Sequence, residues 1–250
     1  MTDLVTYGVR DGVAHLELNR PDAANAFDLP TSHAFGEAVD RAAADDAVRA
    51  VLLTGAGARF CAGGDVASFV AADDQPAYLL ELALHLDGVL RRLAGMPKPV
   101  VCAVQGAVAG AGLGVMLSCD LVVAAEGTKF VFAYPGIGLT PDCGVSYLLP
   151  RAIGSHRALG FALGGRPISA QTALEWGMVT EVAEDATVRA RELVTGLAGA
   201  AAGALGDVRR LLRAGWELDR EATGAEEART ISSRVTGPEA QALIERFVSR

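Results

Sequence analysis

The run KPVVCAVQGAVAGAGLGVMLSCDLVVAAEGTKF, residues 98–130, decides the fold of this 250-residue chain. Residues 99–104 are apolar and predict a buried strand, and residues 121–124 predict another. Between them, the small residues of 110–114 predict a tight turn that leads into a short helix at 115–118. A strand, a turn, a helix and a strand in this order favour parallel pairing in an α/β fold.

The same alternation extends toward the N-terminus. Residues 50–54 (AVLLT) predict a short apolar strand, which a second glycine-rich loop follows, GAGARFCAGGD at 55–65. Residues 14–18 alternate between apolar and polar side chains, as in a half-exposed strand. Asp28 and Pro30 predict the start of a helix. A further helix is predicted over 76–93, where apolar residues recur at the spacing needed for burial: Leu79, Leu80, Ala83, Leu86, Leu90 and Leu93.

From about residue 155 onward the pattern is mostly helical. Ser169 predicts the N-cap of one helix, and Gly177 predicts its end. The chain contains no internal repeat and no obvious linker. We expect a core over residues 1–190, followed by a C-terminal helical region over residues 191–250.

The composition argues against several classes of partner. The formal net charge is −8, whereas a nucleic-acid-binding protein needs a basic surface. Residues 100–119 carry no charge, but Gln105 and four glycines dilute their hydropathy, so we expect no membrane span. The N-terminal residues lack the basic and apolar regions of a signal peptide. We therefore expect a cytoplasmic protein.

The four cysteines, at positions 61, 102, 119 and 143, form no CxxC pair, and no histidine lies at metal-ligand spacing from them. We interpret them as buried, reduced thiols and expect no metal.

Both glycine-rich loops follow an apolar strand and precede a helix. Backbone N–H groups in such a loop can bind an anion or a developing oxyanion. Neither loop has the spacing of a phosphate-binding loop, a dinucleotide site or a nucleophile elbow. On glycine content alone, tight turns are the simpler interpretation, with Asp65 as an ordinary N-cap.

Four segments together resemble a known family. The run VRAVLLTGAGARFCAGGD (48–65) is similar to the first oxyanion loop of the crotonase, or enoyl-CoA hydratase/isomerase, superfamily. Residues 98–130 are similar to its second oxyanion loop. NRPDAANAF (19–27) and GRPISAQTALEWGMV (165–179) resemble further family segments. The resemblance covers about residues 5–180, in the family's order, which makes it far more specific than either loop alone.

The resemblance implies a spiral of ββα units that binds an acyl-CoA thioester. It also implies a C-terminal helical region that builds a homotrimer or a dimer of trimers. The oxyanion hole would be the backbone N–H groups of Ala62 and Ala111, and CoA would be part of the substrate, with no cofactor needed. The implied substrate-binding residues are Ala62, Gly63, Gly64, Asp65, Gly110, Ala111 and Tyr134.

The chain departs from the hydratases of this family, which use two glutamates. Gly114 and Tyr134 stand at those places, so we expect little or no hydratase activity. Asp142, in LTPDCGVSYLLPRAIG (139–154), resembles the acid/base of enoyl-CoA isomerases, in particular the 1,2-epoxyphenylacetyl-CoA isomerase-like members. An ordinary β-turn is the alternative for this Pro-Asp-Cys-Gly step. The resemblance therefore implies double-bond isomerisation, with Asp142 as acid/base.

Two other functions remain open. A dehalogenase- or hydrolase-like enzyme would use Asp142 as a nucleophile and needs a positioned histidine, for which His85 is the helical candidate. A non-catalytic acyl-CoA-binding paralogue would keep the fold and the oxyanion loops alone. For the CoA phosphates, Arg20 or Arg59 could replace the lysine that many family members carry in the segment at 19–27.

Overall fold

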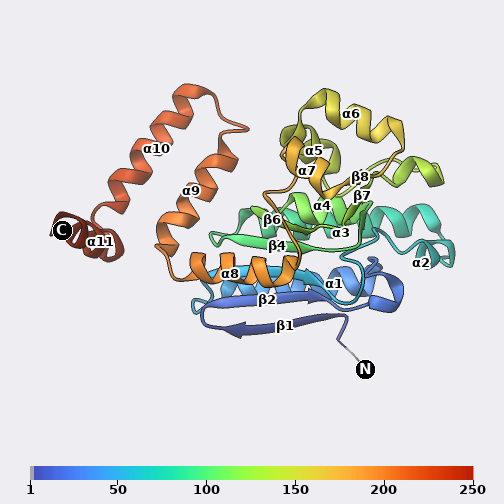
Figure 1. The fold of residues 1–250 in the computed structure, drawn as a ribbon, viewed down its shortest axis with the longest axis horizontal. Coiled ribbons are helices and arrows are strands. Elements are labelled where there is room, and N and C mark those ends of the chain that lie inside the picture. Colours follow the sequence, from blue (N-terminus) through green and yellow to red (C-terminus); the bar gives the residue numbers. More distant parts are fainter. Residues whose placement is uncertain (1–2, 250) are drawn as a thin grey trace.

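The computed structural model describes residues 3–249 and is built around one six-stranded sheet (Figure 1). Its order along the sheet is β1-β2-β3-β4-β6-β9. Only β1 and β2 pair antiparallel, and every other neighbouring pair in this sheet is parallel. The strands are β1 (Val5–Arg10), β2 (Val13–Leu18), β3 (Ala50–Gly55), β4 (Val100–Val104), β6 (Leu121–Ala125) and β9 (Glu181–Ala183). The predicted α/β class and the predicted strands are confirmed.

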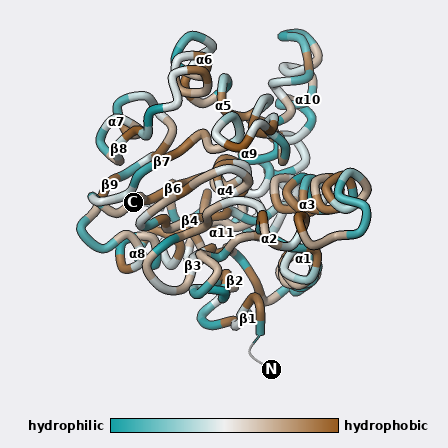
Figure 2. The backbone as a smooth tube through the Cα atoms, turned by 90° about the vertical axis from the view of Figure 1, so that its right-hand side faces the viewer, coloured by the Kyte–Doolittle hydropathy of each residue, from teal (hydrophilic) through white to brown (hydrophobic). Residues whose placement is uncertain are grey.

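Helices cover both faces of this sheet. In Figure 2, α8 (Ala186–Ala198) lies on one side of the strands, while α1 (Leu29–Ala44) and α3 (Gln75–Gly95) lie on the other. Leu52 and Val101 pack toward α8, and Leu53 and Cys102 pack into the larger core on the α1 and α3 side. Burial on both faces explains why β3 and β4 are uninterrupted apolar runs in the sequence.

A smaller sheet lies above the first and consists of β5 (Ala107–Ala109), β7 (Lys129–Val131) and β8 (Ile168–Ser169). Helix α4 (Ala111–Leu117) follows β5 directly. The sequence predicted a tight turn over 110–114 and a helix only from residue 115, and this prediction was wrong. The helix starts four residues earlier because its small residues, including Gly112 and Gly114, let it pack directly against neighbouring backbone.

The remaining elements of the core connect these layers. Asp28 caps α1, since its carboxylate accepts from the Thr31 N–H. Ser169 caps α7 in the same way, and Gly177 ends it at φ +82°, as predicted. The elements that connect the two sheets and the helices packed on them are η1 (Pro21–Ala23), α2 (Val66–Val70), η2 (Tyr134–Ile137), α5 (Val145–Ile153), α6 (Ser155–Gly164) and α7 (Ala170–Trp176).

The C-terminal helices extend away from the two sheets (Figure 1). They are α9 (Ala202–Ala214), α10 (Arg220–Arg234) and α11 (Pro238–Val248). The expected boundary at residue 190 falls inside α8, where Ala190 is completely buried beneath the main sheet. The C-terminal region therefore begins after α8. Within residues 3–249, no helix combines the length and hydropathy needed to cross a membrane.

Candidate active site

A cavity of about 490 Å³ opens between the two glycine-rich loops and the helices α2 and α3. The segment from Ala133 to Asp142 completes its wall. Most lining side chains are apolar, and Asp142 is the one charged residue among the described residues that line it. The lining residues from the helices are Val66, Phe69, Leu79, Leu80, Leu82 and Ala83. A largely apolar cavity of this size with few polar groups is typical of a small-molecule site.

The first glycine-rich loop presents the Gly64 N–H to this cavity. The Ala62 N–H donates to the Ala24 carbonyl at 3.0 Å, so the prediction that it is an oxyanion donor was wrong. Two residues later, Gly64 lines the cavity, and its N–H has no acceptor within the described part of the chain. A Cβ added to Gly64 would meet nothing within 4 Å, which places its backbone against open space.

The second loop presents the Ala111 N–H. Ala111 is the first residue of α4, where backbone N–H groups have no partner inside the helix. It lines the cavity, and no acceptor for its N–H lies within residues 3–249. Gly110 precedes it with φ +52°, a conformation that favours glycine.

The two loops lie side by side. A Cβ added to Gly63 would fall 3.3 Å from the Ala111 nitrogen and 3.1 Å from the Ala109 carbonyl oxygen. Gly63 itself has φ +106° and does not line the cavity. It acts as a spacer that lets the loops approach, rather than as the substrate-binding residue that the sequence predicted.

Asp65 also lies outside the cavity lining. Its carboxylate pairs with Arg20 at 3.0 Å, and the same guanidinium reaches Asp28 at 3.2 Å. Arg20 is therefore committed to holding the first loop against the start of α1, which argues against its use for CoA phosphates. Asp65 occupies the N-cap position of α2, as the simpler interpretation expected, but its side chain forms no capping hydrogen bond. Its role in substrate binding stays a prediction.

Asn25 holds the other end of the first loop, a role that the sequence did not reveal. It is buried at φ +55°, and its amide donates to the carbonyls of Ala56 and Arg59 at 2.9 and 2.8 Å. The segment at 19–27 is thus a brace for the oxyanion loop. Its composition, with two adjacent alanines before the asparagine, gave no sign of that role.

Asp142 and Tyr134 meet at the wall of the cavity. The Tyr134 hydroxyl donates to Oδ1 of Asp142 at 2.8 Å. Tyr134 is 8% exposed, and burial first, then the neighbouring Asp142, raises the pKa of its phenol. The phenol therefore stays protonated near neutral pH and acts as a donor. The Tyr134 ring packs edge-on against the Phe132 ring, with 5.3 Å between the ring centroids.

The turn that carries Asp142 packs directly on Gly114. A Cβ at position 114 would lie 2.6 Å from the Cys143 carbonyl oxygen and 2.8 Å from the Cys143 Cβ. Cys143 and Gly144 both have positive φ, +51° and +72°, and the Val145 N–H donates to the Asp142 carbonyl at 3.0 Å, so residues 142–145 form a β-turn that begins at Asp142. No side chain can stand at position 114 while Asp142 keeps this position.

The histidine needed by a dehalogenase-like mechanism is not found in the cavity. His85 on α3 faces α1, where its Nδ1 lies 2.8 Å from the Ser32 hydroxyl and its ring 4.1 Å from that of His33. Burial first, and then the neighbouring His33, lowers its pKa. His85 is absent from the described residues that line the cavity, so it serves the interface between the two helices.

Leu79 and Leu80 show a further difference from the sequence pattern. Both were expected in the core, yet Leu80 is 62% exposed and both line the cavity. An apolar position on a helix can face either a core or an apolar ligand site, and periodicity does not distinguish the two.

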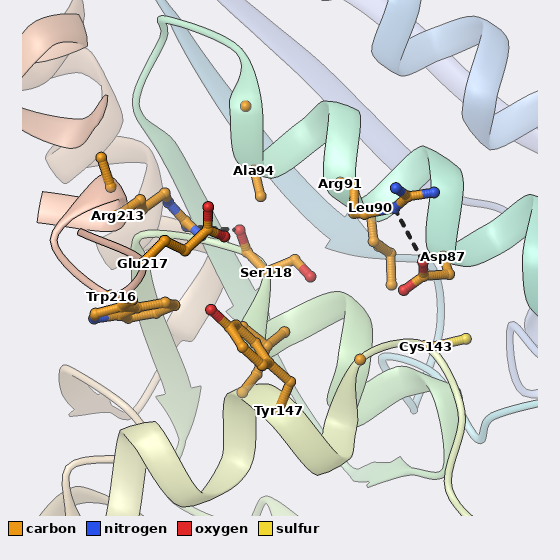
Figure 3. A pocket seen from close by; sticks show the side chains of 14 residues that line it. Asp87, Leu90, Arg91, Ala94, Ser118, Cys143, Tyr147, Arg213, Trp216 and Glu217 are labelled. Atoms are coloured by element: carbon orange, nitrogen blue, oxygen red, sulfur yellow. Dashed lines mark hydrogen bonds and ion pairs between the residues drawn. The ribbon is translucent and has the colours of Figure 1, made fainter. Parts of the chain in front are cut away.

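A second cavity, of about 510 Å³, lies behind the Asp142 turn (Figure 3). Cys143 and Gly144 separate it from the first. The rings of Tyr147 and Trp216, which both line it, lie edge to face with 6.1 Å between their centroids. The four cysteines are free and buried, as expected, and no cluster suited to a metal ion occurs among residues 3–249.

Comparison with known proteins relates this geometry to a family. Residues 8–249 match the family model described as enoyl-CoA hydratase/isomerase. The chain is 43% identical over 190 residues to a 1,2-epoxyphenylacetyl-CoA isomerase of Escherichia coli (strain K12), covering 75% of this chain and 72% of that protein. It is 34% identical over 233 residues to 4-chlorobenzoyl coenzyme A dehalogenase-2 of Arthrobacter sp, covering 91% of this chain and 84% of that protein.

The fold has close counterparts among solved structures. The crystal structure of an enoyl-CoA hydratase from a Polaromonas species superimposes with a TM-score of 0.94 at 30% identity, covering 98% of this chain and 96% of the other. Proteins named as an isomerase, a dehalogenase and a hydratase are thus all similar to this chain, so the reaction has to be argued from the side chains in the cavity.

Proposed function

Because the chain belongs to the enoyl-CoA hydratase/isomerase family, we propose that it moves the double bond of a 3-enoyl-CoA to the 2-position. Asp142 acts as the acid/base. The N–H groups of Gly64 and Ala111 form the oxyanion hole. CoA belongs to the substrate, and the mechanism calls for no metal or redox cofactor.

The observation that carries this proposal is the single carboxylate of the cavity. Adding water to a double bond through this family's mechanism needs two carboxylates, but one suffices to remove a proton and return it. Asp142 is the one acidic residue among the described residues of the lining, and Gly114 leaves no room for a second. The two free N–H groups lie in the same wall.

The proposed reaction has two proton transfers. Asp142 removes a proton from the carbon alpha to the thioester. The electron pair of that C–H bond forms a double bond to the carbonyl carbon, and the π pair of the carbonyl moves onto the thioester oxygen. The Gly64 and Ala111 N–H groups stabilise this enolate, and each such donor typically contributes about 10²–10³ in rate. Asp142 then returns the proton to the gamma carbon as the double bond shifts, which restores its carboxylate.

The test compares wild-type protein with Asp142→Asn in single-turnover conversion of a 3-enoyl-CoA. Asn can keep the same turn, so the melting temperature and acyl-CoA affinity should be unchanged. The isomerisation rate should fall by about 10²–10⁴. Asp11→Asn is a matched control, because that carboxyl is 81% exposed and pairs only with Arg10 among the described residues.

The same assay separates the rival functions. Crotonyl-CoA should not be hydrated at a rate near the typical enzyme value of about 10 s⁻¹. Equal rates for wild type and Asp142→Asn would exclude the acid/base role. Tight acyl-CoA binding without turnover of any enoyl- or aryl-CoA would instead indicate a binding-only paralogue.

A dehalogenase-like reaction is the second candidate, supported by the 34% identity to the Arthrobacter enzyme over 91% of this chain. In that reaction Asp142 would attack an aryl ring as a nucleophile. The position of His85 at the α1–α3 interface argues against it, because no histidine within the described residues lines the cavity to activate water. Halide release from a chlorobenzoyl-CoA would support this candidate over isomerisation.

A further inference from the structure

Asp142 is held by an unusual single partner. Within residues 3–249, the Tyr134 hydroxyl is the one group that forms a hydrogen bond to its carboxylate, and it occupies Oδ1. Lys, Arg and His are absent from the described lining of the cavity. The second oxygen, Oδ2, accepts no hydrogen bond within the described part. The thiol of Cys143 is the other polar side chain beside this carboxylate, and burial first, then the neighbouring Asp142, raises the pKa of that thiol, so it stays protonated. The two oxygens of this carboxylate are therefore not equivalent.

Tyr134 is itself firmly placed. It is the first residue of η2 and is 8% exposed. Its ring packs against the ring of Phe132, which packs in turn against Phe161 with 6.0 Å between the ring centroids. Burial and the neighbouring carboxylate raise its pKa, so the proton stays on the phenol. A hydrogen bond between a fixed neutral donor and a charged acceptor is about twice as strong as one between neutral groups.

We propose that Tyr134 is a positioning residue that reserves Oδ1 of Asp142, so that Oδ2 alone takes the alpha proton and returns it at the gamma carbon. This inference rests on the proposed isomerase function. The C–H bond at the alpha carbon breaks as an O–H bond forms at Oδ2. That O–H bond then breaks as the new C–H bond forms at the gamma carbon.

A fixed carboxyl group has a consequence that can be measured. While Oδ1 is held, the transferred proton stays on an oxygen in an apolar cavity and returns before it exchanges with water. A carboxyl group that has lost Tyr134 can rotate, and its proton exchanges more readily. A substrate deuterated at the alpha carbon should therefore deliver deuterium to the gamma carbon in wild-type protein.

The variant Tyr134→Phe tests this, because it removes the hydroxyl and keeps the ring against Phe132. We expect kcat to fall about 10- to 100-fold, the effect of losing a hydrogen bond to a charged group, with little change in KM. Mass spectrometry should show less deuterium at the gamma carbon. Unchanged kcat and unchanged deuterium transfer would overturn the proposal.

Tyr7→Phe is the matched control. Tyr7 lies on β1, outside the described lining of the cavity, and its hydroxyl has no hydrogen-bond partner within residues 3–249. The same hydroxyl loss should leave kcat, KM and deuterium transfer unchanged. A double variant, Asp142→Asn with Tyr134→Phe, should be no slower than Asp142→Asn alone, because Tyr134 acts through Asp142.

A third measurement does not depend on turnover. In proton NMR, the Tyr134 hydroxyl should give a downfield resonance that disappears in Tyr134→Phe and moves upfield in Asp142→Asn, where the acceptor is neutral. A resonance unaffected by Asp142→Asn would overturn the pairing, whatever the activity. Failure of wild-type protein to isomerise any 3-enoyl-CoA would instead overturn the proposed function, so the two failures are distinguishable.

Discussion

Gly114 packs against the turn that carries Asp142, the acid/base residue of the proposed reaction. The space that a Cβ at position 114 would need is taken by Cys143, the neighbour of Asp142. Where a hydratase of this family has a glutamate, this chain has the backbone of another loop. The loss of one carboxylate and the placement of the other are therefore a single structural change.

Gly114→Ala should separate this packing role from ordinary helix propensity. The added Cβ would lie 2.6 Å from the Cys143 carbonyl oxygen, so the Asp142 turn has to move. We expect stability to fall by about 1–3 kcal/mol. The isomerisation rate should fall by about 10², because a displacement near 1 Å commonly has that effect.

Gly160→Ala is the control for this prediction. Gly160 lies in α6, and its added Cβ would meet nothing within 4 Å. That change should stabilise the protein by about 0.5–1 kcal/mol and leave the rate unchanged. Thermal melts and single-turnover rates for both variants provide the measurement. A Gly114→Ala protein with wild-type rate would show that the turn tolerates the extra carbon.

At the scale of single residues, the sequence located both glycine-rich loops, but the donor predicted in the first loop, the Ala62 N–H, was wrong. Ala62 and Gly64 lie two residues apart among other small residues, and the sequence does not indicate which of their N–H groups lacks a hydrogen-bond acceptor. The distinction depends on the Ala24 carbonyl, 38 positions away, which accepts from Ala62. Ala111 was assigned from the family resemblance alone, and the structure shows it as the first residue of α4, where an N–H has no partner inside the helix.

At the scale of elements, the anchoring of α9 to the core depends on one buried side chain. Arg209 is 8% exposed and donates to the carbonyls of Leu93 and Ala94 at 2.9 and 2.5 Å, at the end of α3. It also pairs with Asp120 at 2.5 Å. It thus satisfies helix-terminal carbonyls that would otherwise be buried without a partner.

Arg209→Met should therefore destabilise the protein strongly. It keeps much of the side-chain volume but leaves the α3 carbonyls without a donor, and we expect a loss of about 3–5 kcal/mol. Arg229→Met removes a guanidinium that is 69% exposed and pairs with Glu226, and should change stability by less than about 1 kcal/mol. Urea unfolding of both variants measures the difference, and similar midpoints would contradict the anchoring role.

The elements most readily predicted from sequence were those buried on both faces. Strands β3, β4 and β6 are short apolar runs, and their type and position followed directly. The start of α4 did not, because Gly112 and Gly114 are poor helix formers and their helical state comes from packing on Cys61 and Cys143. Tertiary contact outweighed local preference there.

At the scale of the whole molecule, the C-terminal helices leave apolar side chains uncovered. Figure 1 shows α10 and α11 extending away from both sheets. Among their exposed side chains are Ile231 at 73%, Phe247 at 79% and Val248 at 75%. Uncovered apolar surface of this kind usually marks an interface. This is the physical basis for expecting the homotrimer or dimer of trimers that the sequence resemblance implies.

Light scattering coupled to gel filtration should therefore give the mass of three or six chains at micromolar concentration. Phe247→Glu should shift the population toward smaller species, because a charge would be desolvated at the interface. Arg10→Glu, at a polar and 92% exposed position at the end of β1, is the control and should leave the mass unchanged. A wild-type monomer would exclude the assembly.

The oxyanion donors of the proposed reaction belong to the main chain, at Gly64 and Ala111, which both line the cavity. Every one of the twenty amino acids except proline carries the same N–H, so a library of substitutions at these two positions would report on shape and never on the donors themselves. The same holds for natural variation, because a substitution can change the side chain at either position while the N–H group that binds the anion remains. Only replacement of the amide by an ester, with glycolic acid for Gly64 or lactic acid for Ala111, would delete a donor without changing the outline of the chain.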